Sequence, residues 1–148
     1  IFARSKHAQL KMTEQWNEVE LNYYAILQNP LKHKNETFIF ESEEKNIKVN
    51  YNFIEAINYS DTTCNLVSVS GLGFSSIECR KAFAQKGNPI VADLTYGAVE
   101  FANNYLKLCC NTIKFRHPFT QKSIKITMNP PKGFNTINPP YKKQNERK

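Results

Sequence analysis

The sequence lacks any long apolar run and holds only five glycines among its 148 residues. Its apolar stretches are short, such as residues 90–92, whereas a helix that crosses a membrane needs about 20 apolar residues in succession. Two of the glycines, Gly71 and Gly73, stand close together, but neither the rest of a GxGxxG pattern nor a GK[ST] motif follows them. These absences exclude a membrane-spanning helix and a phosphate-binding loop of the usual kinds.

Signatures of catalysis or of a metal centre are also missing. The three histidines, His7, His33 and His117, are far apart in the sequence, no serine stands in a GxSxG motif, and no CxxC pair occurs. We therefore predict no catalytic residue, no metal ligand and no cofactor. The sequence favours a binding protein over an enzyme.

Cysteine usage leaves two alternatives open. The number is even, which suits two disulfides in an oxidising compartment, but four buried free thiols fit the spacing equally well: Cys64, Cys79, Cys109 and Cys110. Glycosylation sequons at Asn35 and Asn58 do not decide between them, because composition alone gives about two by chance. Residues 1–11 contain no apolar run like the core of a signal peptide, and localisation stays open.

The net charge of +7 is concentrated in the last third of the chain. Residues 1–103 carry 10 basic and 12 acidic side chains, whereas residues 104–148 carry 10 basic side chains and a single acid, Glu146. An A+T-rich coding bias accounts for abundant lysine, but it does not explain why acids almost vanish after Glu100. A region of one sign is typical of proteins that bind an anionic partner, such as a nucleic acid or an acidic protein surface.

Hydrophobic periodicity predicts an α+β fold, in which an antiparallel sheet of about five strands packs against two main helices. The first helix is expected over residues 13–27, where apolar side chains recur at three- and four-residue steps: Met12, Trp16, Val19, Tyr23 and Leu27. The second is expected over residues 93–108, where another stripe shares one face: Leu94, Ala98, Phe101, Tyr105 and Leu108. We expect Trp16 to be a core anchor.

Alternating apolar and polar residues predict the strands. A hairpin is expected over residues 37–41 and 47–53, a third strand over 64–70 completes an antiparallel meander, and two closing strands are expected over 112–119 and 123–128. A short helix capped by Ser75 or Ser76 is expected over residues 75–85. The chain then divides into a basic N-terminal segment (1–12), a single α+β domain (13–128) and an extended tail rich in proline and lysine (129–148).

Candidate binding residues follow from the charge pattern. The last predicted hairpin would present one basic face, with Lys114, Arg116, Lys122 and Lys125, and the tail adds Lys132, Lys142, Lys143, Arg147 and Lys148. Phe134 and Tyr141 are the tail's candidate anchors for a partner. No metal-binding residue is among the candidates.

Two functional hypotheses follow. In the first, the protein is a non-enzymatic binding protein that contacts RNA, or an acidic surface in a larger assembly, through its basic C-terminal hairpin and tail. In the second, it is a secreted, disulfide-containing module that binds or inhibits another protein. A helix laid across an antiparallel sheet resembles the cystatin-like fold in outline, although residues 121–125 lack the glycine and valine of the Gln-x-Val-x-Gly hairpin of cystatin-type inhibitors.

Overall fold

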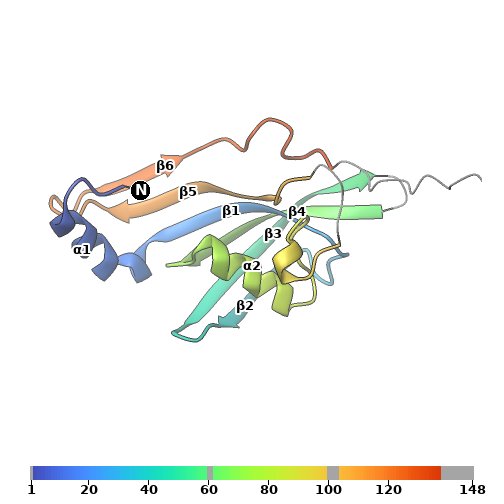
Figure 1. Ribbon diagram of the computed structural model, residues 1–148, viewed down its shortest axis with the longest axis horizontal. Helices are drawn as coiled ribbons and strands as arrows, with labels where there is room; N and C mark the ends of the chain where they lie inside the picture. Colours follow the sequence, from blue (N-terminus) through green and yellow to red (C-terminus); the bar gives the residue numbers. More distant parts are fainter. Residues whose placement is uncertain (1, 60–61, 100–103, 138–148) are drawn as a thin grey trace, which may run out of the picture.

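The computed structural model describes residues 2–59, 62–99 and 104–137 of the chain. Six strands form one antiparallel sheet in the order β2-β3-β4-β1-β5-β6 (Figure 1). They are β1 (Glu20–Leu27), β2 (Asn35–Glu41), β3 (Asn46–Tyr59), β4 (Thr62–Leu72), β5 (Leu108–Arg116) and β6 (Ser123–Thr127). Two α-helices, α1 (Lys6–Glu14) and α2 (Ser76–Gln85), complete the α+β architecture. The predicted fold class is confirmed, with one more strand than expected.

The meander β2-β3-β4, helix α2 and the closing hairpin β5–β6 all lie where the sequence places them. In β3, Ile47, Val49 and Tyr51 are buried and alternate with more exposed polar residues. The side chain of Ser75 accepts a hydrogen bond from the amide of Glu78, which is the expected N-cap of α2. Strands with one solvent-exposed face can therefore be predicted from the alternation of apolar and polar residues, and helix α2 from its capping residue.

The helix predicted over residues 13–27 is wrong, because residues 20–27 form the central strand β1. Leu21, Tyr23, Ala25 and Leu27 alternate along the strand and are buried in the main core. Helix α1 instead occupies residues 6–14, with Ser5 as its N-cap, and a 3₁₀ turn (Trp16–Glu18) links it to β1. Trp16 packs against the main core from that turn, as expected of a core anchor.

The helix predicted over residues 93–108 is also wrong. A short 3₁₀ turn (Leu94–Tyr96) ends at Gly97, whose φ of 93° lies in the left-handed region. Residues 104–107 carry no helix, and Lys107 exchanges backbone hydrogen bonds with Ile26 and Val91 before β5 begins at Leu108. The described part of the apolar stripe is therefore divided between a turn, a connecting segment and a strand, and Phe101 lies outside the described residues.

Each face of the sheet carries its own apolar cluster. Helix α2 covers one face, where Phe74, Cys79 and Phe83 pack on the odd-numbered residues of β1. On the other face a smaller cluster joins Ile26, Cys64, Leu66 and Val91 with residues from after β6.

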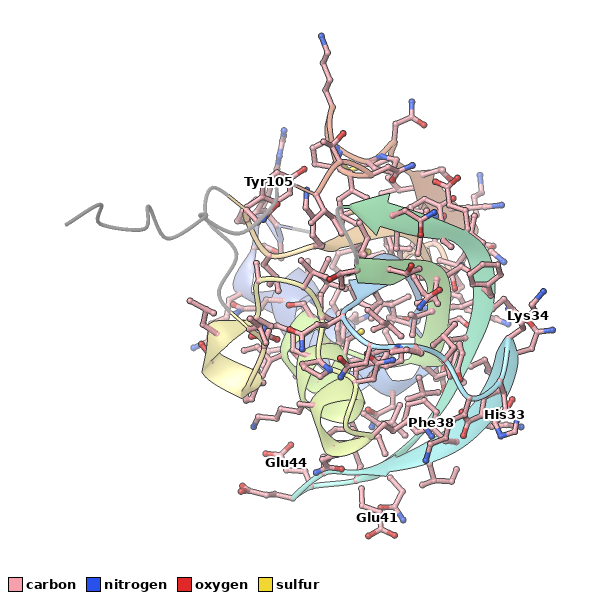
Figure 2. All side chains as sticks on the ribbon, turned by 90° about the vertical axis from the view of Figure 1, so that its right-hand side faces the viewer. His33, Lys34, Phe38, Glu41, Glu44 and Tyr105 are labelled. Atoms are coloured by element: carbon pink, nitrogen blue, oxygen red, sulfur yellow. The ribbon has the colours of Figure 1, made fainter. Side chains whose placement is uncertain are left out.

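Figure 2 shows the molecule from its end, with His33 and Phe38 on the β2 side, across the view from Tyr105.

The segment after β6 is held on the sheet by two buried side chains. Phe134 is 2% exposed and Ile137 is 6% exposed, and both belong to the smaller cluster. We call residues 129–137 the strap. None of the helices that the structure describes is long and apolar enough to cross a membrane.

Candidate functional site

The hairpin β5–β6 separates basic and apolar side chains onto its two faces. Lys114 pairs with Lys125 and Arg116 with Ser123 across the ladder, and side chains of directly paired residues share a face. Ile113 and Phe115 point the other way and pack against the main core. Lys122 lies in the exposed turn between the strands. The hairpin therefore presents Lys114, Arg116 and Lys125 on the face opposite α2.

Helix α1 lies beside this hairpin, which brings the two basic segments of the chain together (Figure 1). The ring of His7 meets the ring of Phe119 edge to face at 5.3 Å, and Lys11 Nζ lies 4.9 Å from the centre of the same ring. Gln15 Nε2 donates a hydrogen bond of 2.7 Å to the carbonyl oxygen of Arg116. These contacts span more than a hundred residues of sequence, and no local pattern signals them.

We name the resulting surface the basic end. It is made of α1, the residues before it and the β5–β6 hairpin, and its basic members are Arg4, Lys6, Lys11, Lys114, Arg116, Lys122 and Lys125. Lys114 Nζ lies 3.4 Å from Glu20 Oε1, and both side chains are about 40% exposed. An ion pair so open to solvent is worth little, so Lys114 stays available to another anion.

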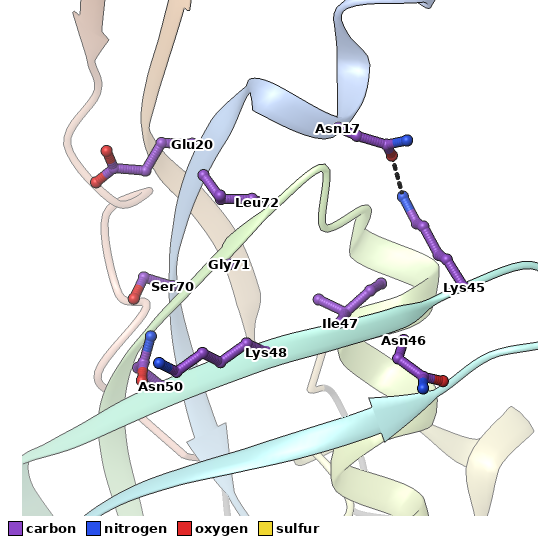
Figure 3. A pocket seen from close by; sticks show the side chains of 10 residues that line it. All are labelled: Asn17, Glu20, Lys45, Asn46, Ile47, Lys48, Asn50, Ser70, Gly71 and Leu72. Atoms are coloured by element: carbon purple, nitrogen blue, oxygen red, sulfur yellow. Dashed lines mark hydrogen bonds between the residues drawn. The ribbon is translucent and has the colours of Figure 1, made fainter.

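The sheet face opposite α2, which we name the open face, carries amide and hydroxyl side chains. Cross-strand pairing aligns one of them from each strand, and we name this series the polar row: Thr37, Asn50, Ser70, Asn22, Thr112 and Thr127. Near its β3 end the open face is hollowed. Figure 3 shows this hollow, of about 620 Å³, with Lys48, Asn50, Ser70 and Glu20 along its wall and Asn17 bonded to Lys45 at its rim.

The candidate residues of the tail have different fates. Lys132 is exposed within the strap. Phe134, expected to anchor a partner, is instead buried against its own sheet, so its ring is not presented to another molecule. The remaining candidates lie outside the described residues: Tyr141, Lys142, Lys143, Arg147 and Lys148.

Two buried charged residues are not among the binding candidates chosen from the sequence. Lys107 is 2% exposed, its Nζ lies 3.4 Å from the carbonyl oxygen of Gly133 and 4.1 Å from the ring centre of Tyr105, and burial lowers the pKa of its amine. Asp93 accepts two hydrogen bonds from the Arg80 guanidinium, at 2.8 and 3.0 Å. Both residues hold connecting segments in place, and their burial could not be read from local pattern.

The remaining groups of chemical interest are the potential metal ligands and the thiols. No group of three or more potential metal ligands occurs within residues 2–59, 62–99 and 104–137. The thiols of Cys79, Cys109 and Cys110 are free; Cys79 is buried, whereas Cys109 is half-buried and Cys110 is exposed, so the expectation of four buried thiols is wrong for these two. Burial raises the pKa of the Cys79 thiol, which keeps it protonated. The structure thus gives no support to the two-bridge staple of the secreted alternative.

Comparison with known proteins gives a likeness in fold. No sequence-family profile matches the chain, and no curated protein matches it in sequence. Two solved human structures are similar: RNA pseudouridylate synthase domain containing 1, with a TM-score of 0.68 and 17% identity, and domain containing 4, with a TM-score of 0.59 and 12% identity. The first match covers 87% of this chain and 62% of the other, and the second covers 85% and 63%. The chain therefore resembles part of these RNA pseudouridylate synthase domains in fold, and spans less than two thirds of their length.

Proposed function

We propose that this protein binds RNA through its basic end, as a binding module to which no catalytic step is assigned. The observation that carries the proposal is the convergence of the two basic segments, from opposite ends of the chain, on one end of the sheet. The β5–β6 hairpin contributes Lys114, Arg116, Lys122 and Lys125 with no acid, and α1 adds Lys6 and Lys11 with one acid, Glu14. The likeness to part of two RNA pseudouridylate synthase domains supports RNA as the anion.

The chemistry expected of such a surface is contact with the phosphate backbone. Lysine and arginine side chains that neutralise phosphates release condensed counterions, which gives affinity with strong salt dependence and little sequence discrimination. Arg116 can form two parallel hydrogen bonds with one phosphate, whereas the lysines act as point charges. The basic residues of the tail, Lys132, Lys142, Lys143, Arg147 and Lys148, are proposed as additional phosphate contacts, and Tyr141 as a stacking or apolar contact.

Three neutralising substitutions test the proposal. Lys114→Gln, Arg116→Gln and Lys125→Gln, combined in one protein, remove three charges from the basic end while keeping polar side chains of similar length. The matched control combines Lys32→Gln, Lys34→Gln and Lys81→Gln, which remove the same charge from exposed positions away from the basic end. Lys32 and Lys34 follow the C-terminal end of β1, about 26 Å along the strand from the end at which α1 lies.

Fluorescence anisotropy with a labelled 12-nucleotide RNA at fixed salt gives the readout. We expect the basic-end variant to bind at least tenfold more weakly than the wild type, and the control to bind within about twofold of it. Equal losses in the two variants would show that only net charge matters, and would contradict the assignment of the site.

A further inference from the structure

We infer that the open face is a track for single-stranded RNA, in which the polar row contacts bases and riboses while lysines beside it hold phosphates. The inference rests on the proposed RNA binding and names the class of RNA and its path. It adds the polar row and Lys48 to the residues that carry the proposed function, and it shares Lys114 and Lys125 with them.

The polar row runs across the whole sheet without a charged or large apolar residue. Each of its six positions carries a side-chain amide or hydroxyl, five of them at least partly exposed and Thr112 7% exposed. Neighbouring strands are about 4.8 Å apart, so the row spans about 24 Å. A second set of the same chemistry lies next to it, where Asn35 pairs with Asn52, Asn52 with Ser68, and Ser68 with Tyr24. The strap covers the region beyond the polar row, around Ile26 and Leu66, and the half-buried Tyr24 of the second set packs against that cluster.

Most of these groups have spare hydrogen-bonding capacity. Thr37 Oγ1 donates to Asn50 Oδ1 at 2.6 Å, but the side chains of Asn22, Ser70 and Thr127 form no hydrogen bond with any other residue that the structure describes. Amides and hydroxyls both donate and accept, as do base edges and the ribose 2′-hydroxyl. A row of lysines alone would bind any polyanion, whereas uncharged groups of this kind match a nucleotide's sugar and base.

Charges flank the row on one side. On four of the six strands a charged residue stands two positions from the polar row, about 6.6 Å away along the strand direction: Lys48, Glu20, Lys114 and Lys125. The same positions on β2 and β4 carry the exposed apolar residues Ile39 and Leu72. The Glu20 carboxylate is offset by Lys114, whereas Lys48 and Lys125 have no ion-pair partner within the described ranges. Phosphates would therefore lie over Lys48, Lys114 and Lys125, and the bases would point across the row.

A single strand fits this surface better than a duplex. The base edges of a duplex are paired and stacked, and its accessible groups are mainly phosphates and 2′-hydroxyls on a curved surface. An unpaired strand can lay its bases on a sheet face and present both base edges and riboses. The span of the row suits a site of several nucleotides, as in other sheet-based single-strand binders.

The test replaces an amide of the row by the carboxylate of the same shape. Asn22→Asp and Asn50→Asp place a negative charge under the path, and Gln85→Glu makes the same change on the exposed surface of α2 as the control. A third protein, Asn22→Ala with Ser70→Ala, removes hydrogen-bonding groups without adding charge. Circular dichroism spectra and thermal unfolding identify any variant whose fold has changed.

The ligands are a labelled 12-nucleotide oligouridine and a 12-base-pair RNA duplex at the same salt concentration. We expect each Asp variant to bind the single strand about tenfold or more weakly, the double Ala variant three- to tenfold more weakly, and the control within twofold of the wild type. The wild type should prefer the single strand to the duplex.

The outcomes separate this inference from the proposed function. If the open-face variants bind like the wild type while the basic-end variant loses affinity, the track is wrong and the proposed function stands. A preference for duplex also overturns the track. If the wild type binds neither RNA, the proposed function fails and the track fails with it.

Discussion

Gly71 shows how a single residue without a side chain fixes the packing of α2 on the sheet. A Cβ atom built at position 71 would lie 2.8 Å from Cβ of Phe74, which is fully buried under α2. Phe74 Cβ is attached directly to the backbone, so the contact cannot be relieved by rotation of a flexible side chain. Gly71 thus serves packing, in agreement with the absence of a phosphate-binding motif.

We therefore expect Gly71→Ala to destabilise the protein by about 1–3 kcal/mol, the usual cost of overpacking. Elsewhere in a strand the same change would be neutral or stabilising, because alanine loses less backbone entropy on folding than glycine. Denaturant unfolding monitored by Trp16 fluorescence measures the change. Ser70→Ala, on the opposite face, is the control and should change the unfolding free energy by less than about 0.5 kcal/mol. A stable Gly71→Ala protein would contradict the packing described for Phe74.

Glu36 makes stability depend on pH in the acid range. Lys86 Nζ lies 2.6 Å from its carboxylate, and this hydrogen bond lowers the pKa of Glu36 below the usual range of a glutamate. A second hydrogen bond comes from the Tyr51 hydroxyl at 2.9 Å, and burial together with that bond raises the pKa of Tyr51 to about 12. Because the folded state holds the charged carboxylate more strongly than the unfolded state, the stabilisation is present above the pKa of the unfolded chain and is lost as pH falls through the lower folded pKa.

Glu36→Gln should accordingly reduce stability near neutral pH and flatten its decline towards acid. The measurement is the unfolding free energy from urea titrations between pH 3 and 7. Glu43→Gln, an exposed glutamate in the β2–β3 turn, is the reference because it should keep the wild-type profile. The ion pair would be irrelevant to stability if the profiles of the Glu36 and Glu43 variants coincided.

At the scale of elements, the predictable strands are those with one face in water. Strand β3 and the hairpin β5–β6 alternate clearly, so period-two patterning places them correctly. Strand β1 is buried on both faces at its end, where Ala25, Ile26 and Leu27 are all covered. Its alternation disappears there, and the remaining apolar spacing fits a helix equally well. The strand conformation of β1 is decided by its pairing with β4 and β5, which are both distant in sequence.

The strap is the element whose behaviour is most sensitive to one side chain. Phe134 buries its ring in the smaller cluster, and Asn135 adds a hydrogen bond of 3.1 Å to Glu55. We expect Phe134→Ala to cost up to about 3–5 kcal/mol if the strap stays docked, or less if it detaches locally. Asn135→Ala, which removes one exposed hydrogen bond, should cost about 1 kcal/mol or less.

Amide hydrogen exchange distinguishes a docked strap from a released one. The amides of Phe134 and Thr136 donate to the carbonyl oxygens of Pro131 and Gly133, so their exchange reports directly on the strap. In Phe134→Ala we expect these amides to lose protection while those of β1 and β4 keep theirs. Retained protection at Phe134 and Thr136 would show that the aromatic ring is not what holds the strap.

At the scale of the whole molecule, the sequence predicted the basic hairpin but not the basic end. The charge asymmetry identified Lys114, Arg116, Lys122 and Lys125, because alternation in a two-faced hairpin is a local property. The addition of Lys11 depends on the contacts of α1 with Phe119 and Arg116, and the polar row depends on pairing among all six strands. Long-range contacts of this kind leave no periodic trace in one sequence, so the surface could be assembled only from the structure.

The assembled surface also predicts how affinity changes with salt. If Lys11, Lys114, Arg116, Lys122 and Lys125 all neutralise phosphates of a single strand, the logarithm of the association constant should fall with the logarithm of salt concentration with a slope of about −3.5. The variant with glutamine at positions 114, 116 and 125 removes three of those contacts, so its slope should be about −1.4. Anisotropy titrations between 50 and 300 mM potassium chloride measure both slopes.

The variant with glutamine at positions 32, 34 and 81 should keep the wild-type slope, because counterion release depends on which charges touch phosphate and not on net charge. A slope near zero for the wild type would mean that backbone charge does not hold the RNA, and the basic end would then not be its binding site.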